Sequence, residues 1–184
     1  DYDALVTLNL LVPMRLCQAV LPAMRKRGSG QIVNIGSMTG LIPLPHMTGY
    51  VAAKSGLKGY SDALRRELTG TGITISHIAP RAVRTTMNSG KAGLLNRRTN
   101  VTEDDPRDVA RQIVNAIEHD KTDVRIGWPE RLFALINAVI PGIVDRGLRK
   151  NTAIGEEILK ADQVVAPIPL IANKPDANPR SHPA

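Results

Sequence analysis

The chain has 184 residues and a formal net charge of +7, with 42% hydrophobic and 3% aromatic residues. This length favours one domain with a sizeable core, which must be aliphatic because aromatic side chains are scarce. The basic residues are scattered and few rings could stack on bases, so no nucleic-acid partner is expected.

Two long helices and one strand are predicted in the first part of the chain. Residues 3–26 form the first helix, because apolar residues recur at the helical period from Leu5 to Leu16. Residues 31–36 are β-branched and read as a buried strand, and a loop with two prolines follows at 37–47. The second helix spans about 48–69 and ends at the glycines that follow it.

The second part alternates strands and helices again. Residues 73–79 are predicted to form a strand, and residues 80–104 a polar connection that is unusually long. A helix begins after Asp105, which has the N-cap position before a proline, and runs to about 119. A third strand at 123–127 precedes a helix from 128 that is broken near residue 141.

This order predicts an α/β fold: an incomplete, Rossmann-like, doubly wound parallel sheet of about three strands with flanking helices. We expect the domain to span residues 1–149, followed by an extension at 150–184 whose Pro-rich part is disordered. No Gly-rich phosphate-binding turn is found. Gly36 and Gly40 come closest, but Ile42 stands where a third glycine would be needed.

Cellular location is limited by two sequence features. The single cysteine, Cys17, excludes an internal disulfide and fits a reducing, cytoplasmic compartment. No signal peptide is visible, and no apolar stretch is expected to reach about 18 residues. The chain begins with Asp1 inside a helical pattern, which is typical of the later part of a longer polypeptide.

The most informative pair is Tyr50 and Lys54, four residues apart on the second helix. At this spacing two side chains share a helix face with Cβ atoms about 6 Å apart. A lysine ammonium this close should lower the pKa of the phenol, which would suit a general acid/base. A surface lysine beside a core tyrosine is the alternative, and the spacing alone does not decide between them.

The surroundings of this pair resemble the short-chain dehydrogenase/reductase family. Asn9, Ser37, Tyr50 and Lys54 are similar in order to its Asn-Ser-Tyr-Lys tetrad. Three neighbouring segments match as well, from Tyr2 to Gly127 overall: Leu8-Asn9-Leu10, the strand Ile32-Val33-Asn34-Ile35-Gly36-Ser37 with Gly36 in place of a serine, and Leu64-Arg65-Arg66-Glu67-Leu68.

The resemblance implies hydride transfer between NAD or NADP and a small carbonyl or alcohol substrate. Tyr50 would be the acid/base, Ser37 would hydrogen-bond the substrate oxygen, and Lys54 would lower the pKa of Tyr50 and bind the nicotinamide ribose. Pro80, Val83 and Thr85 would lie along the nicotinamide. Family members pair through the two long helices, here 3–26 and 48–69, which implies a homo-oligomer. An inactive member or a non-catalytic fragment is the alternative.

Three positions carry a structural interpretation beside the functional one. Ser37 could simply cap a turn. Asn9 is expected on or near the buried face; Pro13 leaves its carbonyl without the usual donor, so the helix should kink and could hold the family's relay water there. Arg81 replaces a family glycine. If that glycine has a positive φ, arginine would be strained there, which implies either a different turn or an altered cofactor contact; contact with a phosphate is a further alternative.

The remaining candidates are less specific. The four histidines have no metal-ligand spacing, so no metal site is predicted. His46 precedes Tyr50 and could approach the substrate or lie on the surface. The helix at 129–150 combines apolar and basic residues, and it could pack as an extra helix, form an oligomer contact or touch a membrane surface.

Overall fold

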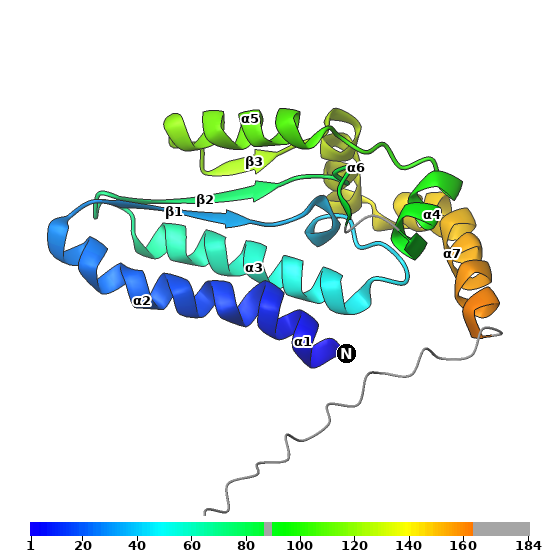
Figure 1. Ribbon diagram of the computed structural model, residues 1–184. Helices are drawn as coiled ribbons and strands as arrows, with labels where there is room; N and C mark the ends of the chain where they lie inside the picture. The colour runs from blue at the N-terminus through cyan, green and yellow to red at the C-terminus, as the bar shows by residue number, and fades with distance from the viewer. Residues whose placement is uncertain (87–89, 164–184) are drawn as a thin grey trace, which may run out of the picture.

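The computed structural model describes residues 1–86 and 90–163, and its centre is a three-stranded parallel sheet (Figure 1). Strands β1 (Gly30–Ile35), β2 (Ile73–Ala79) and β3 (Asp123–Arg125) lie in the order β1-β2-β3. Gly30 pairs with Ile73 and His77 with Asp123. The predicted α/β class and the parallel sheet are confirmed.

Helices cover both faces of this sheet (Figure 1). On one face lie α1 (Tyr2–Val6), the π-helical turn η1 (Thr7–Leu11), α2 (Val12–Arg27) and α3 (Thr48–Glu67). Their core with the sheet consists of Cys17, Ile32, Leu64, Leu68, Ile73 and Ile75. Helix α5 (Pro106–Glu118) packs on the other face through Ile78, Val109, Ala116 and Ile126.

A third cluster lies beyond the carboxyl ends of the strands. Helices α6 (Trp128–Val139) and α7 (Pro141–Gln163) pack there against the loop after β1, which contains the short 3₁₀ helix η2 (Met38–Gly40). Asn137 donates its side-chain N–H to the Leu41 carbonyl at 3.2 Å. His46 Nε2 lies 2.9 Å from the Thr152 carbonyl and donates to it in the tautomer that carries its hydrogen on Nε2. The loop that precedes Tyr50 is therefore held by both helices.

Two boundaries differ from those expected. The connection at 80–104 contains a helix, α4 (Gly90–Arg98), which contacts α7 through an Arg98–Glu157 ion pair at 2.8 Å. Helix α7 continues past residue 150 to Gln163, so the first part of the expected extension is helical. The Pro-rich part of that extension lies outside the described residues.

The first helix is not a regular α-helix along its whole length. A π-helical turn occupies Thr7–Leu11 and ends two residues before the proline at position 13, and the N–H of Val12 bonds to the Thr7 carbonyl five residues back. Since proline cannot supply the N–H that the fourth preceding carbonyl normally receives, an irregular turn at this point has a local cause. The irregularity expected from Pro13 is therefore present.

The apolar stripe on this helix was expected to be buried, and that expectation is wrong. Its members are exposed: Leu5 by 37%, Leu8 by 69%, Val12 by 36% and Leu16 by 61%. Tyr2–Arg27 is also long and apolar enough to cross a membrane by length and composition, contrary to the expected absence of such a stretch. Core helices of soluble proteins share that composition, so it decides nothing by itself.

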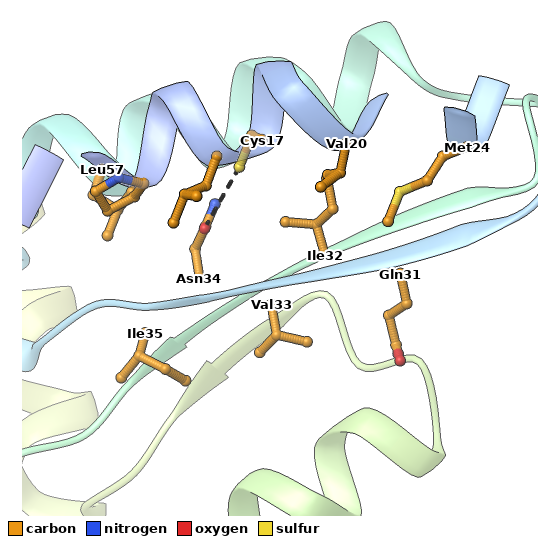
Figure 2. Close-up of a pocket in the computed structure, with 11 residues that line it drawn as sticks. Cys17, Val20, Met24, Gln31, Ile32, Val33, Asn34, Ile35 and Leu57 are labelled. Carbon is orange, nitrogen blue, oxygen red and sulfur yellow. Dashed lines mark hydrogen bonds between the residues drawn. The ribbon is translucent and has the colours of Figure 1, made fainter. Parts of the chain in front are cut away.

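An apolar groove of about 470 Å³ runs between α2 and β1 (Figure 2). Cys17, Val20 and Met24 line it from the helix, and Ile32 and Asn34 from the strand. Within residues 1–86 and 90–163, β1 pairs only with β2, and Ile35 at its end is 42% exposed. The sheet is therefore open along β1.

Candidate active site

The candidate site lies where β1 and β2 end, at the edge of a parallel sheet where open α/β folds bind ligands. The Gly36 N–H donates to the Ile78 carbonyl at 2.7 Å, and the Met38 N–H to the Pro80 carbonyl at 2.9 Å. These two bonds join the loop after β1 to the segment after β2. Ser37 is thereby fixed beside the buried Pro80.

Ser37 is held by its own turn. It is the N-cap of η2, and its Oγ accepts from the Thr39 N–H at 3.2 Å and from the Thr39 hydroxyl at 2.9 Å. The Ser37 side chain also lies close enough to Tyr50 to lower the pKa of its phenol. The capping role and the site role thus coexist. Thr39, which the sequence did not single out, orients Ser37, and its spacing two residues after a loop serine was the available signal.

Tyr50 and Lys54 stand one turn apart on α3, as their spacing predicted. The Lys54 Nζ lies 5.6 Å from the centre of the Tyr50 ring. It donates to the Ile35 carbonyl at 3.0 Å, at the end of β1. The backbone of α3 approaches η2 so closely that a Cβ on Gly40 would lie 2.9 Å from the Lys54 carbonyl oxygen. The structure therefore brings Ser37, Tyr50 and Lys54 together.

The expected effect of Lys54 on Tyr50 is not what the structure gives. Burial raises the pKa of Tyr50 above its usual value, and the nearby Ser37 side chain offsets this only in part. Burial also lowers the pKa of Lys54. The predicted net decrease of the Tyr50 pKa is therefore wrong for this structure, because desolvation outweighs the stabilisation of the phenolate. At neutral pH Tyr50 is a phenol and can donate a proton.

Asn9 lies in η1, which packs against α3, the helix of Tyr50 and Lys54. It is only half-buried, although it was expected on or near the buried face. Its side-chain N–H donates to the Leu5 carbonyl at 3.1 Å, back along its own helix. This bond satisfies the amide locally and leaves Asn9 one helix away from the site.

Pro80, Val83 and Thr85, the residues after β2 that were predicted to lie along the cofactor, do not all lie at the site. Pro80 is buried and bonded to Met38. Val83 is half-buried and forms an isolated parallel bridge with Asp104. Thr85 is exposed, shortly before residues 87–89, which lie outside the described part of the chain. The structure thus places Pro80 at the site and Thr85 on the surface.

Arg81 has a role that the sequence did not reveal. Its guanidinium donates to both oxygens of Asp104, at 2.9 and 2.6 Å, and to both oxygens of Glu130, at 3.2 and 3.1 Å. These half-buried carboxylates raise the pKa of Arg81. Its φ is not positive, so the strain considered at this position is absent. Two carboxylates compensate its charge, which argues against a phosphate partner.

Comparison with known proteins identifies the family. A family model described as short chain dehydrogenase matches residues 1–93, which include every candidate residue from Asn9 to Thr85. The chain is 40% identical over 123 residues to the dehydrogenase/reductase SDR family member 7B of Danio rerio, covering 63% of this chain and 40% of the relative. It is 33% identical over 153 residues to the ketoacyl reductase HetN of Nostoc, covering 79% and 53%. This chain thus spans about half the length of these relatives.

Solved structures agree with this assignment. A short-chain dehydrogenase from Streptomyces avermitilis superposes with a TM-score of 0.62 at 26% identity, covering 89% of this chain and 61% of that one. One from Burkholderia cenocepacia, in complex with NADP, has a TM-score of 0.68 at 20% identity, covering 81% and 59%, and supports the fold alone. From its sequence match and its fold, the chain belongs to the short chain dehydrogenase family of oxidoreductases.

Proposed function

We propose that the whole protein transfers hydride between NAD or NADP and a carbonyl or alcohol substrate, with Tyr50 as the acid/base. The observation that carries the proposal is the convergence of Ser37, Tyr50 and Lys54 at the ends of β1 and β2. Three polar groups from two different elements meet there beside a buried backbone, which is the arrangement that proton transfer to a bound carbonyl requires.

In the direction of carbonyl reduction, Tyr50 acts as the acid. Because it is a phenol at neutral pH, its O–H bond breaks as the proton moves to the substrate oxygen. Ser37 donates a second hydrogen bond to that oxygen and stabilises the charge that develops there. Lys54 remains beside the ring and stabilises the phenolate that is left, until a proton from solvent restores the phenol.

A nicotinamide cofactor would supply the hydride when it is bound. The residues present fit its nicotinamide side: Lys54 presents donors at the end of β1, and Pro80 forms a buried wall at the end of β2. No Gly-rich strand-to-helix turn is found in the sequence for the phosphates. We therefore expect the 184-residue chain alone not to bind NADPH in the micromolar range. Micromolar binding in a fluorescence titration would contradict this expectation.

The test of the proposal is turnover by the whole protein. The relatives named as a ketoacyl reductase and as the 3-oxoacyl-[acyl-carrier-protein] reductase FabG of Escherichia coli make 3-oxoacyl thioesters the first substrates to try, beside simple ketones. NADH and NADPH should each be followed by their absorbance. Tyr50→Phe should lower turnover by about 10²–10⁴-fold, the usual contribution of a general acid, while cofactor affinity is kept.

Tyr60→Phe is the matched control, because Tyr60 lies on the same helix but packs against the core cluster around Cys17. It should keep turnover within a few fold. If Tyr50→Phe retained the turnover of the wild type, the assignment of Tyr50 would be rejected. The inactive-member alternative would be supported if the wild type oxidised neither cofactor with any substrate.

We also propose that the protein is a homo-oligomer through α1–α2 and α3. The exposed Leu8 and Leu16 support this, since exposed leucines on one helix favour a partner surface. Replacing both by serine should reduce the mass of the whole protein in light scattering to that of a monomer. An unchanged mass would exclude this surface.

A further inference from the structure

Helix α6 carries most of its large apolar side chains on the outside. Trp128, Leu132, Leu135 and Val139 follow one another at spacings of four, three and four residues, so they form one stripe. They are exposed by 74, 50, 59 and 70%. At the junction with α7, Ile140 and Ile143 extend this surface and are exposed by 52 and 53%. We call these six residues the α6 face.

The inner side of the same helix is partly polar, and it fixes the orientation of the helix. Glu130 bonds to Arg81 with both oxygens, and Asn137 bonds to the Leu41 carbonyl. Only Ala134 is fully buried between them. Rotating the helix to bury the α6 face would break these bonds and leave half-buried charges unpaired, which is costly. The apolar side therefore stays outward.

Charge around the α6 face selects among its possible partners. Arg131, Arg146, Arg149 and Lys150 are exposed, and between residues 128 and 150, all of which the structure describes, Asp145 is the one exposed acid. A second copy meeting the same face across a two-fold axis would bring basic groups toward basic groups. A partner with an apolar interior and a negatively charged boundary would be complementary both to the apolar residues of the α6 face and to the basic residues around it.

We propose that the α6 face docks on an anionic lipid surface. Amphipathic helices with tryptophan and leucine on one side and basic residues beside it lie in the membrane interface in this way. Tryptophan prefers the interfacial region, because its ring is apolar and its N–H needs a polar partner. The net charge of +7 adds a long-range attraction to a negative surface.

The experiment uses the 184-residue chain with vesicles of phosphatidylcholine alone or mixed with phosphatidylserine. Trp128 is the only tryptophan in the sequence, so its emission reports on the α6 face without a label. With the mixed vesicles the emission should shift to shorter wavelength and the protein should float with the lipid. Vesicles of phosphatidylcholine alone should bind at least about tenfold less protein than the mixed vesicles at low salt, and so should the mixed vesicles in high salt.

Two variants separate the α6 face from the other exposed apolar helix. Leu132→Ser combined with Leu135→Ser and Val139→Ser should reduce flotation at least about tenfold, while Leu8→Ser with Leu16→Ser and Val20→Ser on α1–α2 should retain it. A third variant, with Arg146, Arg149 and Lys150 each changed to glutamate, tests the charge without altering the apolar residues. It should also lose flotation, and circular dichroism should be unchanged for all three.

Three outcomes would overturn the proposal. One is flotation lost with the α1–α2 variant and kept with the α6 variant, because the lipid would then bind the first helix. Another is equal binding to neutral and anionic vesicles. The third is no flotation together with a dimer that the α6 variant converts to a monomer, since a second copy would then cover the α6 face.

Discussion

The imidazole ring of His77 occupies the space that a side chain on residue 36 would need. A Cβ placed on Gly36 would lie 2.1 Å from His77 Nε2, and His77 itself is only 1% exposed. Residue 36 is the position at which the family pattern has a serine. The histidine on β2 and the glycine after β1 are therefore one compensating pair, directly before the candidate catalytic Ser37.

Gly36→Ala should destabilise the protein because the ring has no free space to move into. Overpacking of this kind typically costs about 1–3 kcal/mol. Gly59→Ala on α3 is the control, because no atom lies within 4 Å of a Cβ there, and it should be neutral or stabilising. Urea denaturation of both variants measures the free energies of unfolding.

The coupling between the two residues can be measured in a double-mutant cycle. In the presence of His77→Ala, the change Gly36→Ala should cost much less than it does alone. If the two costs simply added, the steric explanation would be incorrect.

Arg81→Ala should destabilise the protein more than the loss of an ordinary surface arginine. It leaves Asp104 and Glu130, which are 19 and 25% exposed, without their partner. We expect the free energy of unfolding, measured by urea denaturation, to fall by about 1–3 kcal/mol, between the values for exposed and fully buried pairs. Arg84→Ala is the control, because its pair with Asp105 is exposed by 66 and 41%, and it should cost much less than Arg81→Ala. Similar losses for both variants would show that Arg81 is not a structural link.

Ser37→Ala should reduce turnover of the whole protein and alter its pH dependence. Loss of a donor to the developing oxyanion typically costs about 10²–10³-fold. Since the Ser37 side chain lowers the pKa of Tyr50, its removal should raise that pKa further. Reduction needs protonated Tyr50, so the alkaline decline in rate should move to higher pH. A decline that moved to lower pH, or did not move, would separate Ser37 from Tyr50.

Asp123 should make the protein sensitive to acid. The contact with His77, whose Nδ1 stands 3.8 Å from Asp123 Oδ1, and then the charges of Lys58 and Arg125 lower the pKa of Asp123 to about 2. A lowered carboxylate pKa stabilises the fold above the ordinary value of 3.8, and this contribution disappears as the pH falls toward 2.

Because Asp123 is partly exposed, we expect no more than about 1 kcal/mol from this effect after solvent screening. Asp123→Asn should remove that part of the dependence of stability on pH between about 4 and 2, whereas Asp145→Asn on the surface of α7 should leave the profile unchanged. Identical profiles for the wild type and Asp123→Asn would contradict the stabilising role of this carboxylate.

The sequence was sufficient to predict the sheet and the placement of Tyr50 and Lys54 on one helix face, because both depend on local spacing. The β-branched runs gave strands at 31–36 and 73–79 within one residue, and the Tyr50–Lys54 spacing placed both side chains on one helix face. Asp105 is also the predicted N-cap, since its side chain accepts from the Arg107 N–H.

The expectations that failed concern burial. The periodicity of apolar residues shows which face of a helix is apolar, but not whether other parts of the protein cover that face. A helical stripe of leucines shows that one face of the first helix is apolar, but not that this structure buries it, and Leu8 is 69% exposed. For the same reason the pKa of Tyr50 was misjudged, since spacing along the helix does not determine how far its phenol is buried, and burial raises this pKa. Helix α4 was missed because its sequence is polar and begins with glycine.

The position of Cys17 makes the groove between α2 and β1 observable without any added reporter. Its thiol is 3% exposed and lies 3.8 Å from the Asn34 side-chain oxygen, on the strand (Figure 2). As the sole thiol of the chain, it can react with an alkylating reagent only when the first long helix lifts from the strand. The rate of its alkylation therefore measures how readily the helix separates from the strand.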